Sequence, residues 1–151
     1  MKTKGYLMSA VLTVALVVIL FGAWMMSNSG MVLLSQEFPE IPEGRDFQGE
    51  LLCEETDRGI PVLLTDEQYQ LAFSATQVKE KGSAEELSFP AFVIRFTGTE
   101  HYEIFIGADG RICVTDALQK SSRFFLDRSR GIFRSLYEQH LASGGTPVPG
   151  I

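Results

Sequence analysis

An uninterrupted apolar run near the N-terminus constrains this chain more than any other feature of its sequence. Residues Gly5 to Met26 read GYLMSAVLTVALVVILFGAWMM and contain no charged side chain. As a helix rising about 1.5 Å per residue, the run reaches roughly 33 Å, which matches a bilayer hydrocarbon core of about 30 Å. Helices buried in a soluble core are seldom so uniformly apolar. The run therefore predicts a transmembrane anchor over residues 5–26.

The charges that flank this run predict its orientation. Lys2 and Lys4 precede it, and no charged residue follows it before Glu37. Because lysine and arginine favour the cytoplasmic side, we expect residues 1–4 to be a cytoplasmic stub and the rest of the chain to be extracytoplasmic. The alternative is a secreted protein whose signal peptide is cleaved near the Ser-Asn-Ser segment 27–29. Signal-peptide apolar regions span only about 7–15 residues, so a retained single-pass anchor is favoured.

Composition then divides the remainder of the chain. Residues 27–46 contain a Ser-Asn-Ser-Gly opening, two prolines and spaced acidic residues, a composition typical of a tether. Residues 47–143 are long enough to bury one core and form the predicted extracytoplasmic domain. Residues 144–151 are expected to be a loose tail.

The charge of the domain restricts its partners. All 19 acidic residues follow the apolar run, whereas Lys2 and Lys4 account for two of the 13 basic residues. The domain is therefore more acidic than the whole chain, whose formal charge is −6. Such a charge argues against general affinity for nucleic acid or for anionic lipid.

Alternating apolar and polar residues predict an antiparallel meander in the second half of the domain. Three runs between Ala91 and Asp116 each carry apolar side chains at every second position, which is typical of strands with one buried face. Residues 47–55, 60–64 and 123–126 predict three further strands. The meander residues expected to face the core are Phe92, Ile94, Phe96, Tyr102, Ile104, Ile106, Ile112 and Val114.

The register of the meander follows from the requirement that opposed residues share a face. A two-residue turn at Asp109-Gly110 would divide the apolar residues between both faces. A three-residue loop over 108–110 instead pairs Ile106 with Ile112 and places Gly110 where a left-handed backbone is needed. Parity predicts the same loop length over residues 98–100.

Two amphipathic helices complete the predicted domain. Thr65 can cap the first, and Gln68, three residues on, can close a capping box. Asp127 can cap the second, whose apolar stripe ends before Gly144. We therefore expect an α+β fold: an N-terminal transmembrane helix followed by a small two-layer domain, in which two helices cover an antiparallel β-meander.

The two cysteines allow two interpretations. In an oxidising compartment, a Cys53–Cys113 disulfide would close a loop of about 60 residues and add roughly 4 kcal/mol of stability. The alternative is two separate thiols, because Cys113 lies on the meander face away from the core. The register also separates His101 from Cys113 by roughly 13 Å, too far for a catalytic pair. His140 falls in the apolar stripe of the last helix and is interpreted as a satisfied structural histidine.

Motifs for enzymatic chemistry are lacking in the sequence. It contains no nucleophile elbow, paired-histidine helix, phosphate-binding glycine loop or calcium loop, and no residues at metal-ligand spacing. We expect a non-enzymatic domain without cofactor or metal. Carboxylates are numerous, but the sequence does not pair an acid with a base.

Two surfaces are candidates for binding a partner. The first is a strip formed by Val93, Phe105 and Cys113, side by side on the face away from the core. The strip is either exposed to a partner or covered by the tether or the first strands. The second is a basic patch suited to a phosphate, a carboxylate or an acidic protein. Its members are Lys120, Arg123, Arg128, Arg130 and Arg134.

These features predict an extracytoplasmic accessory or sensory domain, anchored in the membrane through residues 5–26. Its expected partner is another envelope protein or a wall-associated ligand. One alternative is a structural subunit of a membrane assembly. A less favoured one is a carboxylate-based envelope hydrolase.

Overall fold

The computed structural model describes residues 3–39, 41, 47–53, 59–82, 86–96, 102–149 and 151. The chain forms two compact units, Met1–Met31 and Val32–Ile151.

The first unit consists of the long helix α1 (Thr3–Asn28). Its side chains are described from Leu12 to Met26, and the large apolar ones among them are exposed on all sides of the helix. Within the described residues, none of the helices combines the length and the apolar character that crossing a bilayer requires.

The second unit is built around a mixed α+β arrangement. An eight-stranded sheet has the order β1-β4-β8-β7-β6-β5-β2-β3. In this spatial order, each pair of neighbouring strands between β4 and the edge strand β3 is antiparallel. Four consecutive strands, β5 to β8, form the meander. The strands are β1 (Met31–Leu33), β2 (Phe47–Leu52), β3 (Ile60–Val62), β4 (Gln77–Lys81), β5 (Ala91–Phe96), β6 (Tyr102–Gly107), β7 (Arg111–Asp116) and β8 (Ser121–Leu126).

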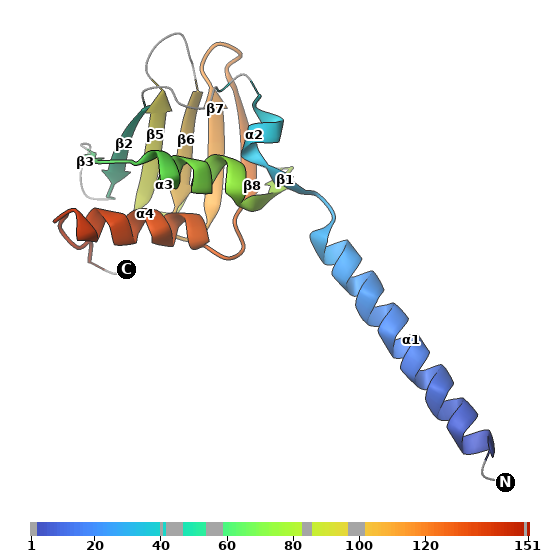
Figure 1. Ribbon diagram of the computed structural model, residues 1–151. Coiled ribbons are helices and arrows are strands. Elements are labelled where there is room, and N and C mark those ends of the chain that lie inside the picture. Colours follow the sequence, from blue (N-terminus) through green and yellow to red (C-terminus); the bar gives the residue numbers. More distant parts are fainter. Residues whose placement is uncertain are drawn as a thin grey trace. The chain divides into compact units, whose positions relative to one another are not determined.

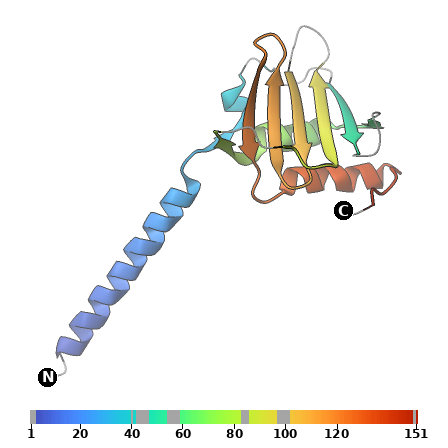
Figure 2. The same ribbon diagram turned by 180° about the vertical axis from the view of Figure 1, so that it is seen from behind.

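The helices of this unit lie on one face of the sheet. These are α3 (Asp66–Gln70), its π-helical continuation η1 (Leu71–Ala75) and α4 (Gly131–Ala142), which cross the strands in Figure 1. A short helix, α2 (Leu34–Glu37), lies near β8. Figure 2 shows that no described helix covers the opposite face of the sheet. The core therefore lies between the sheet and the helices, where Phe73, Phe92, Ile104, Ile112 and Leu136 are at most 2% exposed.

The predicted register of the meander is confirmed. Ile104 lies opposite Val114, and Ile106 lies opposite Ile112. The loop over 108–110 has three residues, and Gly110 takes a φ of +89° while its N–H donates to the Gly107 carbonyl at 2.9 Å. The loop predicted over 98–100 lies outside the described residues, although the β5–β6 register agrees with its parity.

The predicted start of the first helix is also confirmed. The Gln68 side-chain Oε1 accepts a hydrogen bond from the Thr65 N–H at 2.9 Å, and the Gln68 N–H donates to the Thr65 hydroxyl at 3.4 Å. These reciprocal bonds satisfy two of the amides that a helix N-terminus leaves unpaired. The helix then differs from the single α-helix expected, because it continues as the π-helical segment η1 and ends at Ala75.

Several elements were not predicted or have different limits. Strand β1 was assigned to the tether, and the residues of β4 were expected to continue the first helix up to Gly82, whereas β4 is a strand that pairs with β8 through Lys79 and Leu126. The tail is better anchored than expected, because the Val148 N–H donates to the Tyr137 hydroxyl at 2.9 Å and Val148 packs against the core. These segments carry too few apolar residues for a local pattern, so long-range pairing determines their structure.

Asp127 accepts from the first turn of α4 from a buried position, but it is not the N-cap that the sequence predicted, because α4 begins at Gly131 and its N-cap is Arg130. It is 2% exposed, and its carboxylate accepts from the Ile132 N–H at 3.0 Å and from the Ser129 N–H and hydroxyl at 2.9 and 2.6 Å. Arg130, which lies between Ser129 and Ile132 in the sequence, has a left-handed backbone conformation with a φ of 55°. Asp127 therefore joins the end of β8 to the start of α4.

We expect Asp127→Ala to lower the free energy of unfolding by about 2 kcal/mol, because it removes the carboxylate that accepts from the first turn of α4 and leaves amide donors unpaired. Urea denaturation followed by circular dichroism measures this loss. Asp66→Ala is the matched control, since Asp66 also begins a helix but is exposed, and its loss should stay below about 0.5 kcal/mol. Equal losses in the two variants would contradict this role of Asp127.

Candidate functional site

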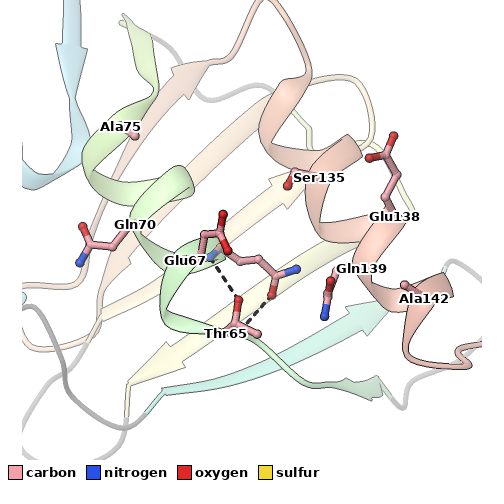
Figure 3. Close-up of a pocket in the computed structure, with 9 residues that line it drawn as sticks. Thr65, Glu67, Gln70, Ala75, Ser135, Glu138, Gln139 and Ala142 are labelled. Atoms are coloured by element: carbon pink, nitrogen blue, oxygen red, sulfur yellow. Dashed lines mark hydrogen bonds between the residues drawn. The ribbon is translucent and has the colours of Figure 1, made fainter.

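A groove of about 600 Å³ separates α3 and η1 from α4 on the helical side of the domain. Figure 3 shows Thr65 and Glu67 on the side of α3, with Ser135 and Gln139 across from them on α4, whereas the Gln70 side chain is directed away from α4. Its size lies within the range of ligand-binding clefts, about 300–1,000 Å³. All of its lining residues are polar or small: Thr65, Glu67, Gln68, Gln70, Ala75, Ser135, Glu138, Gln139 and Ala142.

Gln68 is the buried polar group of this groove. Its side chain is held by the capping box, which occupies the amide oxygen with the Thr65 N–H. Only 7% of Gln68 is exposed. Its Nε2 group has no hydrogen-bond partner in the described part of the chain, although a primary amide carries two N–H donors. The capping box thus fixes the orientation of the Gln68 amide, whose Nε2 group can donate to a ligand in the groove.

Two carboxylates stand on opposite walls of the groove. Glu67 belongs to α3 and Glu138 to α4, and both are exposed. Neither forms an ion pair with any residue that the structure describes. Arg134 precedes Glu138 by four residues on α4, a spacing at which helical ion pairs can form, but these two side chains do not form one. The groove therefore carries unneutralised negative charge.

The apolar strip occupies the uncovered face of the sheet, as its register predicted. Val93 lies opposite Phe105, which lies opposite Cys113. Val93 is 0% exposed and Cys113 7%, whereas Phe105 is half-buried. Phe124 continues the strip opposite Cys113 and is also half-buried. Because cross-strand neighbours lie about 5 Å apart, the rings flank the smaller side chains. The strip is longer and less accessible than the three-residue strip expected.

An ion-pair row borders the strip. The Arg95 guanidinium donates to Glu103 on β6 at 2.8 Å and to Glu50 on β2 at 2.5 Å. The hydrogen bonds that Arg95 donates to Glu50 and to Glu103 raise the pKa of Arg95 above its ordinary value, and the bond to Glu50 has the larger effect. Arg95 and Glu103 lie directly opposite each other on β5 and β6, and Glu50 extends the ion pair to a third strand.

The five residues of the basic patch do not come together. Lys120 lies in the turn before β8, whereas Arg128 and Arg130 follow the other end of that strand, roughly 20 Å away. Arg123, in between, is engaged by Glu37 and Glu80 at 2.6 Å each.

The start of α4 is also less suited to an anion than the sequence suggested. The Ile132 N–H already donates to Asp127. Only Arg130 and Arg134 share a hollow, of about 190 Å³, with the aromatic residues Phe133 and Tyr137. The geometry gives little support to a single five-residue anion site.

The cysteines are free thiols in the structure. Cys53 packs against the core, whereas Cys113 belongs to the strip on the other face of the sheet. Side chains on opposite faces do not meet the geometry of a disulfide. Cys53 also lines an apolar hollow of about 280 Å³ with Phe89, Pro90 and the tail.

His140, the histidine that the structure describes, is a buried residue of α4. His140 is 3% exposed, and its Nε2 lies 3.2 Å from the Thr146 carbonyl, which agrees with a satisfied structural histidine. His101 lies outside the described residues. Across the described ranges, no group of three histidine, cysteine or acidic residues could hold a metal ion.

Comparisons with protein-family models, with curated proteins and with solved structures each find no match.

The groove was not identified from the sequence, although one signal for it exists. Ser135, Glu138, Gln139 and Ala142 recur at three- and four-residue spacing and so share the face of α4 next to its apolar stripe. A polar face on one helix has the same appearance as an ordinary solvated face, so only its position opposite α3 distinguishes it.

Proposed function

We propose that this protein is a membrane-anchored, extracytoplasmic accessory or sensory domain that binds an envelope protein or a wall-associated ligand in the groove between α3 and α4. One observation carries the proposal: a groove of ligand-binding size is lined wholly by polar and small residues, and one of them, Gln68, is largely buried and holds its side-chain amide in a capping box. Such groups provide specificity in binding clefts.

The anchor in this proposal is supported by the sequence and by α1. The uncharged run extends from Gly5 to Met26 and is therefore longer than the part of α1 whose side chains are described, which begins at Leu12. The large apolar side chains described along α1 are exposed, and an all-apolar exposed helix is stable in a lipid environment. The lysines before the run support an extracytoplasmic domain.

A groove-filling substitution tests the binding function. We expect Ser135→Trp to reduce recovery of the native partner, crosslinked in membranes and purified in detergent, at least tenfold. Gln119→Trp, in the exposed turn after β7, is the matched control and should leave recovery within twofold. The proposal fails if both variants recover the partner equally well while remaining folded and membrane-associated.

A carboxylate-based envelope hydrolase is the second candidate, and a specific observation supports it. Glu67 and Glu138 line one groove from opposite helices, as an acid and a base on two sides of a substrate would. In this case purified protein degrades cell-wall material, and Glu67→Gln and Glu138→Gln each reduce the rate at least a hundredfold. Absence of any such degradation by the wild-type protein excludes this candidate.

A further inference from the structure

The groove between α3 and α4 has an unusual balance of chemical groups. Its lining holds two carboxylates, three glutamine amides and two hydroxyl groups, and includes neither a basic nor an aromatic residue. A ligand that complements this lining carries positive charge and offers both hydrogen-bond donors and acceptors.

The charge preference depends on the absence of internal counterions. Glu67 and Glu138 form no ion pair within the described residues, and Arg134, one helical turn before Glu138, does not neutralise it. Each carboxylate accepts hydrogen bonds and cannot donate when ionised. A lysine or arginine side chain supplies both the positive charge and the hydrogen-bond donors that complement the two carboxylates, through charge-assisted hydrogen bonds.

Gln68 adds an independent requirement. It is 7% exposed, and its Oε1 is occupied by the Thr65 N–H, so its Nε2 group is the part of the amide that can donate to an acceptor on the ligand. A simple amine has no acceptor to offer, whereas each peptide unit carries a carbonyl. The neighbouring Gln70 and Gln139 offer further donors and acceptors along the walls. The ligand is therefore basic and also contains amide carbonyls.

We propose that the groove binds a basic, extended peptide segment, with its cationic side chain between Glu67 and Glu138 and a backbone carbonyl accepting from Gln68 Nε2. This inference rests on the proposed binding function and names the class of its partner: a protein that presents a lysine- or arginine-containing segment.

The test uses the full-length protein in detergent micelles and the fluorescent peptide Ser-Lys-Gly-Lys-Ser, with binding followed by anisotropy at 150 mM salt. The peptide Ser-Glu-Gly-Glu-Ser should bind at least tenfold more weakly. Glu67→Gln and Glu138→Gln should each weaken binding of the lysine peptide at least fivefold. Glu86→Gln removes the same charge from an exposed position outside the groove and should change the affinity less than twofold.

Gln68→Glu tests the carbonyl contact without disrupting the helix. Glutamate at this position still accepts from the Thr65 N–H in a capping box, but it lacks the amide donor. Spermidine, a cation without a carbonyl, serves as the comparison ligand. The ratio of lysine-peptide affinity to spermidine affinity should fall at least fivefold in this variant, and thermal melting should show that the domain remains folded.

Three results would overturn the inference: equal binding of the lysine and glutamate peptides, equal effects of Glu67→Gln and Glu86→Gln, or an unchanged affinity ratio in Gln68→Glu. If these occur while Ser135→Trp still reduces partner recovery, the groove binds a ligand of another class. If Ser135→Trp also has no effect, the proposed function fails with the inference.

Discussion

Replacing Phe92 by alanine should lower the free energy of unfolding by about 4 kcal/mol, the largest loss expected for a single substitution in this domain. Phe92 is 1% exposed on β5, an interior strand of the sheet, and its ring centroid lies 5.2 Å from that of Phe133 on α4. The substitution removes the main aromatic contact between sheet and helix and leaves a cavity that the close-packed core fills only in part.

Chemical denaturation of the two purified variants measures this effect. Phe89→Ala is the matched control, because Phe89 is 48% exposed and the same atoms are removed. Its loss should be about 1 kcal/mol or less. A loss for Phe92→Ala no larger than that of the control would show that α4 does not pack on β5 as described.

Replacing Gly110 by alanine should cost about 3 kcal/mol. Its φ of +89° is strained for a residue with a side chain, and an added Cβ would lie 2.3 Å from the Asp127 carbonyl oxygen. That oxygen belongs to the backbone, so it can move only with the end of β8. The strain and the displaced backbone each contribute about 1–3 kcal/mol.

Gly144→Ala separates these two contributions. Gly144 has a φ of +85°, but no heavy atom lies within 4 Å of the position of an added Cβ. This variant should lose only the strain contribution, about 1 kcal/mol. Thermal and urea denaturation of both variants measure the difference, and equal losses would show that Gly110 does not closely approach Asp127.

Much of the sheet could be predicted because local patterns determine it. The alternation around Ile104 and Ile112 identifies the buried face, and only one loop length keeps both residues on it. The capping residue Thr65 was likewise identified from side-chain chemistry that acts within a few residues. Asp127 was expected to be the N-cap of the last helix, but α4 begins later, with Arg130 as its N-cap.

Other elements could not be predicted, because their stability comes from distant partners. Strand β4 contributes one fully buried side chain, Val78, so its sequence lacks the alternation of a half-buried strand. It forms because it pairs with β8, whose residues lie some forty positions later. The basic patch was wrong as a unit because Arg123 is engaged by Glu37 and Glu80, which come from two other elements.

The sequence by itself determined the uncharged N-terminal run, the buried face and register of the meander, and the capping box that begins α3. Each depends on interactions within one segment or between adjacent strands. Only the tertiary structure decided which polar side chains share a site. Glu67 and Glu138 are far apart in the chain and form no pattern, and the groove exists because α3 and α4 pack on the same face of the sheet. Burial of their apolar stripes positions the two helices, and their remaining polar faces then become the two walls of one candidate site.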